Sequence, residues 1–249
     1  MTRKILVIGI ASAVLVLTGN AQAQQSLEVL SPYVVKGEAE IETQGALGYD
    51  RTSSSSQGQD IIGSFGYSPN TYWRSELESE FERSSGPEQK IRYSSINSEN
   101  TFELTEPGEY WIDTAVFAEL DVGRDHTPDN TLFGLLVGKT VGHVEGTANF
   151  LLHKDFGGNQ GLTPLGFAYS DQTKYRIIPA FEPGIEIYGD TQGREKFADQ
   201  QLSVGPGIFG KIPTYDAQAL KYQLAYLRGA TPATPDNTVR WLVEYEFYF

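Results

Sequence analysis

The last stretch of the chain, residues 239–249, reads VRWLVEYEFYF. Apolar and aromatic side chains occupy every second position, at Val239, Trp241, Val243, Tyr245, Phe247 and Phe249. The charged residues lie between them, at Arg240, Glu244 and Glu246. Successive side chains of a β-strand point to opposite faces, so this pattern predicts a strand with one apolar and one charged face.

The same alternation recurs upstream, most clearly in residues 37–49, 73–82, 110–122 and 220–226. On a helix, the glutamates of 73–82 would spread around the whole cylinder instead of sharing one side. The glycines and β-branched residues of these segments also disfavour a helix. We therefore predict an all-β protein.

The length of these segments separates a soluble sheet from a membrane sheet. They run for about 11–14 residues, whereas a strand of a soluble protein has about 5–6. At about 3.3 Å per residue and a tilt of about 35–45°, such strands cover the apolar band of about 25 Å of a bilayer. The pattern thus favours strands whose apolar side chains face lipid over a two-layer soluble sandwich.

Counting back from the C-terminus predicts twelve strands, near 36–49, 59–67, 71–83, 91–104, 109–122, 131–141, 143–153, 165–178, 180–189, 201–212, 215–229 and 238–249. Longer connections are expected at 50–58, 84–90, 123–130, 154–164, 190–200 and 230–237, and shorter turns between them at 68–70, 105–108, 142, 179 and 213–214. Such alternation is typical of bacterial outer-membrane barrels, which have short periplasmic turns. The predicted fold is an all-β, transmembrane, antiparallel up-and-down barrel of about twelve strands.

Some segments fit this pattern poorly. Residues 91–104 alternate weakly, and Lys139 shares a face with the apolar residues of 131–141. Pro183 and Pro206 fall inside predicted strands, where we expect bulges or irregular pairing. Ten strands therefore remain an alternative.

The N-terminus has the features of an export signal. Arg3 and Lys4 precede an apolar stretch of about 13 residues, and Ala21-Gln22-Ala23 then offers a cleavage site. We predict a signal peptide at 1–23, a periplasmic lead-in at 24–35 and an outer-membrane barrel at 36–249.

The composition excludes several classes of protein. The chain has 249 residues, no cysteine and a formal net charge of −13. Disulfide frameworks, thiolate metal sites and cysteine nucleophiles are thereby ruled out, and a nucleic-acid partner is not expected without a basic face. No motif for a cofactor or a metal is found, so neither is predicted.

The charged faces of the strands would point into the barrel, where an ion must be hydrated or paired. The predicted pore-lining residues are Glu38, Glu40, Glu42, Arg74, Glu76, Glu78, Glu80, Glu82, Glu186, Lys221, Arg240, Glu244 and Glu246. A water-filled lumen with net negative charge would pass small hydrophilic solutes and prefer cations. Acids and bases could instead cross-link into a plug, which leaves a closed barrel with a structural or ligand-binding role.

An outer-membrane hydrolase is a further alternative, because some twelve-stranded barrels hydrolyse lipids with a serine and a histidine. The three histidines are His126, His143 and His153, and no serine motif accompanies them. A nucleophile triad needs a serine within hydrogen-bond reach of an oriented histidine. We expect no catalytic residue and no enzymatic activity.

Several stretches resemble a known group of proteins: SPYV at 31–34, LTEPGEYW at 104–111, FEPGIEIYGD at 181–190 and ATPD at 233–236. On these stretches the chain resembles an uncharacterised family of proteobacterial outer-membrane β-barrels of the transporter or porin type. The terminal strand ending in Phe249 also resembles the signal by which the barrel assembly machinery recognises such proteins. The resemblance implies localisation in the cell outer membrane and partners that are lipid, the assembly machinery and small solutes. It implies no particular substrate.

Overall fold

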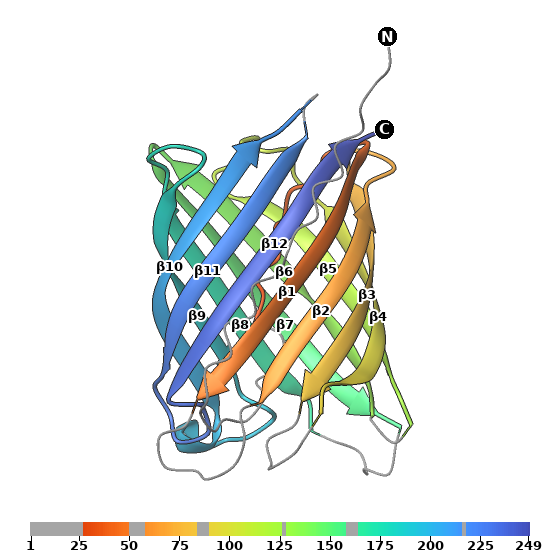
Figure 1. The fold of residues 1–249 in the computed structure, drawn as a ribbon, viewed down its shortest axis with the longest axis vertical. Helices are drawn as coiled ribbons and strands as arrows, with labels where there is room; N and C mark the ends of the chain where they lie inside the picture. Colours follow the sequence, from red (N-terminus) through yellow and green to blue (C-terminus); the bar gives the residue numbers. More distant parts are fainter. Residues whose placement is uncertain (1–26, 50–57, 84–89, 126–127, 158–163, 216–217) are drawn as a thin grey trace.

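A computed structural model describes residues 27–49, 58–83, 90–125, 128–157, 164–215 and 218–249. Twelve antiparallel strands form one closed barrel in which each strand pairs with its neighbours in sequence (Figure 1). The strands are β1 Glu38–Tyr49, β2 Gln59–Tyr67, β3 Trp73–Arg83, β4 Arg92–Glu103, β5 Asp113–Gly123, β6 Asp129–Val141, β7 Val144–Phe156, β8 Gly166–Tyr175, β9 Glu182–Asp190, β10 Gln201–Pro213, β11 Ala219–Gly229 and β12 Asn237–Tyr248. The predicted fold class and the count of twelve strands are confirmed, and the alternative of ten strands is wrong.

The first and last strands close the barrel. β1 and β12 pair in one register over their whole length, from Glu38 opposite Tyr248 to Tyr49 opposite Asn237. The amide of Phe249 continues this ladder by donating to the carbonyl of Gly37. We call the end of the barrel at Glu38 and Tyr248 the upper rim, and the end at Tyr49 and Asn237 the lower rim (Figure 1). Closure leaves no unpaired strand edge.

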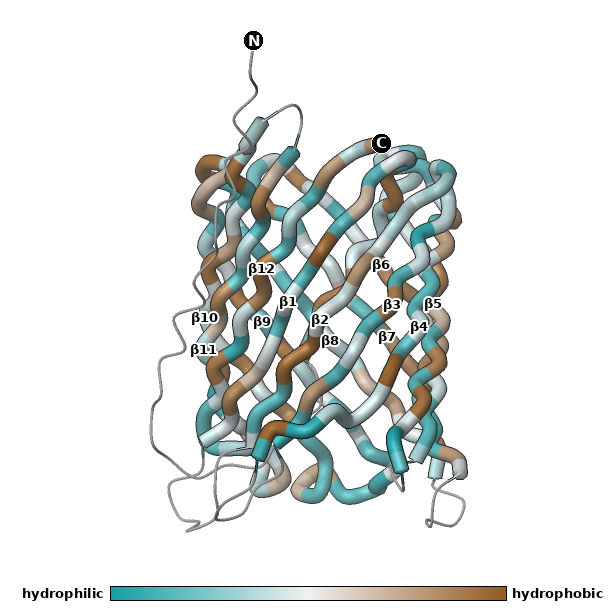
Figure 2. The backbone as a smooth tube through the Cα atoms, turned by 45° about the vertical axis from the view of Figure 1, so that its right-hand side comes forward, coloured by the Kyte–Doolittle hydropathy of each residue, from teal (hydrophilic) through white to brown (hydrophobic). Residues whose placement is uncertain are grey.

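The alternation seen in the sequence separates the two faces of the wall. Large apolar side chains lie on the outside, where Ile41, Leu77 and Phe133 are 55%, 54% and 60% exposed. Their glutamate neighbours Glu40 and Glu78 are buried inside the barrel. Hydrophobic and hydrophilic positions therefore alternate along the tube in Figure 2. This arrangement is the reverse of a soluble protein and suits a lipid surround.

The segments that fitted poorly form strands, and β4 pairs with β3 through one register shift, between Glu80 and Phe81. Residues 91–104 form β4, and residues 131–141 lie in β6, whose Lys139 faces outward and donates from Nζ to the carbonyl of Tyr110 near the upper rim. β9 and β10 keep a single register through Pro183 and Pro206. The pairing of β10 with β11 passes over Gly205 and Pro206 without a change of register. The irregular pairing expected at these prolines is thus limited to the gap in the β10–β11 ladder at Gly205 and Pro206.

The predicted lengths of several connections are wrong, including the turn predicted at 179, which spans residues 176–181. The strand expected at 109–122 begins only at Asp113, because residues 104–112 form an extended turn in which Trp111 is 79% exposed. This turn at the upper rim is longer than the connection 124–128 between β5 and β6 at the lower rim. Alternation of long and short connections therefore fails at β5. No helix in the described ranges is long and apolar enough to cross a membrane.

Candidate functional site

The lumen is not empty, because an N-terminal segment lies inside it. Residues 27–34, which we call the luminal segment, run along the inner wall toward the upper rim, where β1 begins. Leu30 exchanges two hydrogen bonds with Asn149 of β7: its amide donates to Oδ1 at 2.8 Å, and its carbonyl accepts from Nδ2 at 2.9 Å. The side chain of Arg240 donates to the carbonyl of Leu27. These contacts fix the lower half of the segment to opposite sides of the barrel.

The upper half of the luminal segment is held by carboxylates. The hydroxyl of Tyr33 donates to Asp113 at 2.9 Å, and the amide of Val34 donates to Glu103 at 2.7 Å. Residues 27–34, which belong to the periplasmic lead-in predicted at 24–35, lie inside the barrel, and the division into lead-in and barrel stays a prediction. The predicted signal peptide, 1–23, lies outside the described residues.

Apolar contacts add to this anchoring. Leu27 packs with Tyr188, Ala225 and Leu227. Leu30 packs in a separate cluster with three wall residues, Ala115, Phe117 and Leu136. Both leucines are buried, at 7% and 5% exposure. The inward apolar positions of β5, β6, β9 and β11, which would be unfavourable in a water-filled pore, therefore form binding surfaces for the luminal segment.

Basic side chains gather on the wall formed by β8 to β12, and carboxylates pair with them. The guanidinium of Arg240 contacts Glu186 at 2.9 Å and Gln223 at 2.8 Å. It also lies 5.9 Å from the centre of the Tyr188 ring. Arg240 is 1% exposed and Glu186 is not exposed at all. Further ion pairs on this side join Lys221 to Glu244 and Glu246, Lys211 to Glu246, and Lys174 and Arg176 to Glu145 and Glu182.

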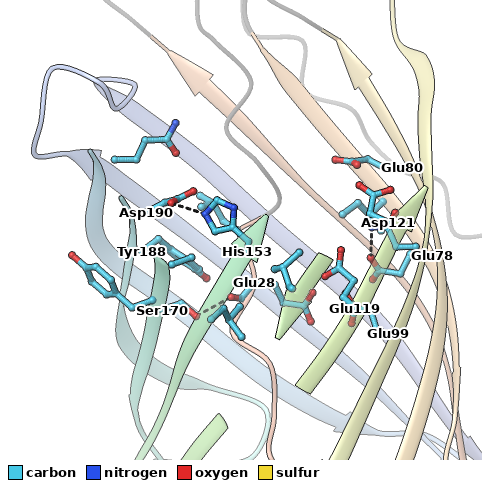
Figure 3. A pocket seen from close by; sticks show the side chains of 18 of the residues that line it. Glu28, Glu78, Glu80, Glu99, Glu119, Asp121, His153, Ser170, Tyr188 and Asp190 are labelled. Carbon is cyan, nitrogen blue, oxygen red and sulfur yellow. Dashed lines mark hydrogen bonds and ion pairs between the residues drawn. The ribbon is translucent and has the colours of Figure 1, made fainter. Parts of the chain in front are cut away.

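The wall formed by β3 to β5 is acidic and lacks such partners. Its inward carboxylates include Glu78, Glu80, Glu99, Glu119 and Asp121, which gather on one side of the view in Figure 3. None of the ion pairs found among the described residues involves any of these five groups. Ser95 donates to Glu80 at 2.9 Å, and Asn97 donates to Glu78 at 3.4 Å. The lumen is therefore polarised across its width, with free carboxylates on one wall and paired charges on the other.

The luminal segment borders two separate cavities. One, of about 140 Å³, is lined by the acidic wall, Glu28, His153 and Asp190. The other, of about 230 Å³, lies toward the upper rim and is lined by Tyr33, Arg74 and Lys221 among others. Residues of the segment line both cavities, so it partitions the space within the barrel.

The structure places the predicted pore-lining residues on the inner face of the wall. All thirteen occupy inward positions of β1, β3, β9, β11 or β12. They do not form one site: Arg74 pairs with Glu40 at 3.3 Å, whereas Arg240 pairs with Glu186 on the other side. Whether they line a conducting path stays a prediction.

Sequence reasoning missed several carboxylates that lie with them, among them Glu28, Glu99 and the buried Asp60 of β2. Glu28 was assigned to the lead-in, and Glu99 lay in the weakly alternating segment 91–104. Small polar residues at every second position, Ser95, Asn97 and Thr101, were the available signal that Glu99 faces inward.

The histidines do not assemble a nucleophile triad among the described residues. His153 Nε2 lies 2.9 Å from Asp190 Oδ1, but Ser170, which lines the same cavity, donates to Asn149 and to the carbonyl of Glu28 (Figure 3). His143 Nδ1 lies 3.1 Å from the carbonyl of Arg176. His126 is outside the described residues. The hydrolase alternative therefore gains no support from this geometry.

Comparison with known proteins yields structural similarity only. No protein-family model and no curated protein matches the chain. Among solved structures, the NanC porin aligns with a TM-score of 0.53 at 9% identity, over 84% of this chain and 100% of that one. A bacterial polysaccharide outer membrane secretin aligns with a TM-score of 0.43 at 11% identity, over 86% and 99% of the two chains. The outer membrane protein OmpT of Vibrio cholerae gives 0.37 at 8% identity, over 85% and 98%. The likeness to the porin shows a shared barrel fold.

Proposed function

We propose that this protein is an outer-membrane barrel that passes small hydrophilic solutes and prefers cations. The observation that carries the proposal is the inward acidic wall of β3 to β5, where Glu78, Glu80, Glu99, Glu119 and Asp121 take part in no ion pair among the described residues. A lumen lined by one sign of charge concentrates the opposite ion and repels the same sign. The bases of the lumen are largely neutralised by their ion pairs, so the unpaired carboxylates dominate its field.

The lipid-facing side supports the location. Apolar side chains cover the outside of every strand, and a barrel that lacks free edges satisfies its backbone hydrogen bonds without water. We infer that the strand ending in Phe249 is the segment that the barrel assembly machinery recognises. The upper rim, where both β1 begins and β12 ends, is then the periplasmic rim.

The luminal segment favours a second candidate, a closed barrel with a structural or ligand-binding role. Its hydrogen bonds to Asn149, Asp113 and Glu103 hold it across the space that a solute would use. With the segment in place, the two cavities beside it have volumes of about 140 and 230 Å³, enough for a small ligand. The two candidates differ in whether ions cross the barrel.

Conductance of the purified protein in planar bilayers separates these candidates. We expect single-channel currents. In a tenfold KCl gradient, the reversal potential should have the sign given by K⁺ permeation, and its magnitude should be below the ideal value of about 59 mV. Removal of residues 24–34 should raise the conductance. Glu78→Gln combined with Glu119→Gln should lower the cation preference, whereas Glu109→Gln, in an exposed turn, should leave it unchanged. Absence of current from both the full chain and the shortened chain would favour the closed barrel, and anion selectivity would contradict the proposed preference.

A further inference from the structure

Three carboxylates from three different parts of the fold converge inside the barrel. Glu28 belongs to the luminal segment, Glu78 to β3 and Glu99 to β4. One oxygen of each lies within 4.8 Å of an oxygen of the other two. All three side chains line the cavity of about 140 Å³ seen in Figure 3.

Glu99 is buried without any compensating partner. Its exposure is 7%, and among the described residues no hydrogen bond or ion pair reaches its carboxylate. Strand register places it opposite Glu76 on β3 and opposite Glu119 on β5. Like charges that face each other across strands destabilise a sheet, and a buried carboxylate without a partner costs several kcal/mol. No side chain of the described residues forms a hydrogen bond or ion pair that compensates this charge.

Hydrogen bonds to the backbone of the luminal segment, and one to the Glu28 carboxylate, hold Glu28 close to Glu78 and Glu99. Its carbonyl accepts a hydrogen bond from Ser170 at 3.1 Å, and Leu30, two residues on, is bonded twice to Asn149. Gln44 donates to one oxygen of the Glu28 carboxylate at 2.8 Å. The luminal segment thus presents a third carboxylate to a wall that already carries an excess of them.

One divalent cation can contact all three carboxylates, because the three oxygens lie within 4.8 Å of one another and Ca–O distances are about 2.3–2.6 Å. Ca²⁺ also tolerates irregular geometry and accepts water for its remaining ligands, for which the adjoining cavity has room.

We propose that Glu28, Glu78 and Glu99 bind one calcium ion inside the barrel. The ion joins the luminal segment to the wall, because Glu28 is the only one of the three ligands outside the sheet. It offsets two of the three negative charges of the cluster and stabilises the folded barrel with the segment in place. This inference concerns binding and stability and does not depend on whether the barrel conducts ions.

Isothermal titration calorimetry of the full mature protein in detergent tests the site directly. After treatment with EDTA and dialysis, CaCl₂ should bind with a stoichiometry of one per barrel, and MgCl₂ should bind at least tenfold more weakly. Glu99→Gln and, separately, Glu28→Gln should each weaken Ca²⁺ binding at least tenfold. Glu109→Gln makes the same charge change in an exposed turn and should bind like the unaltered protein.

A second measurement covers the case in which a wall variant does not fold. Glu28→Gln alters no strand, so the barrel should form, as circular dichroism would verify. The unaltered protein should have a higher Tm in Ca²⁺ than in EDTA, and this difference should shrink in Glu28→Gln. Absence of heat from the folded, unaltered protein would overturn the proposal and assign the neutralisation to protons. Unchanged affinity in both glutamine variants would overturn it as well.

Discussion

Arg240→Met probes the central ion pair of the lumen. The guanidinium and Glu186 lie 2.9 Å apart, and both side chains are at most 1% exposed. At this separation and an effective dielectric constant of about 20, Coulomb's law gives an attraction of about 6 kcal/mol. The cost of dehydrating two ions offsets much of that attraction in the intact pair.

Loss of the arginine alone removes the attraction but leaves the dehydrated carboxylate. We therefore expect Arg240→Met to lower the free energy of unfolding by about 3–5 kcal/mol. Combining it with Glu186→Gln should recover most of this loss, because the remaining buried charge is gone. Arg124→Met is the matched control, since the Arg124–Asp125 pair is exposed and should contribute about 0–1 kcal/mol.

The assay is equilibrium unfolding in urea of the protein folded into lipid vesicles, followed by tryptophan fluorescence. Two results would refute the reasoning: a loss from Arg240→Met no larger than that from Arg124→Met, or no recovery in the double variant. Either would mean that water reaches Glu186 despite its complete burial.

Three further predictions concern the lipid face, the wall and the luminal segment. Leu77→Arg, near the middle of β3, should lower the free energy of unfolding in vesicles by about 2–4 kcal/mol. Leu104→Arg, beyond the end of β4, should lower it by about 0–1 kcal/mol. Equal losses from the two variants would contradict a bilayer around the barrel. Gly205→Ala places a Cβ 1.9 Å from a backbone carbonyl oxygen of β11 and should lower the free energy of unfolding by about 1–3 kcal/mol. A Cβ at Gly63 has no atom within 4 Å apart from those of its chain neighbours, so Gly63→Ala should leave the Tm unchanged. Burial raises the pKa of the Tyr33 hydroxyl above its usual value of 10.0. The unfolded chain then loses this proton first as the pH rises, so the stability that the hydroxyl contributes is present below about pH 10 and lost above it. Tyr33→Phe should flatten the fall in unfolding free energy above about pH 10, and an unchanged slope would contradict this role.

Much of the wall could be predicted from the sequence because its signal is local. Side chains of a strand alternate with a period of two, and the residues of 239–249 or 73–82 reveal both the strand and its two faces without reference to any partner. Segment length then distinguished a membrane barrel from a soluble sheet. The prediction failed at 109–112, where aromatic residues of a turn continue the parity of the strand that follows.

The contents of the lumen depend on tertiary structure. Residues 27–34 have no periodicity that marks them as a luminal segment, and their partners Asn149 and Arg240 lie more than a hundred residues away. The cluster of Glu28, Glu78 and Glu99 requires both the register of β3 against β4 and the position of that segment. The sequence by itself determined which side chains face outward and which face inward, because that follows from local alternation. Only the closed barrel decided which inward charges meet a partner, because those distances are set by pairing between strands and by the chain that threads between them.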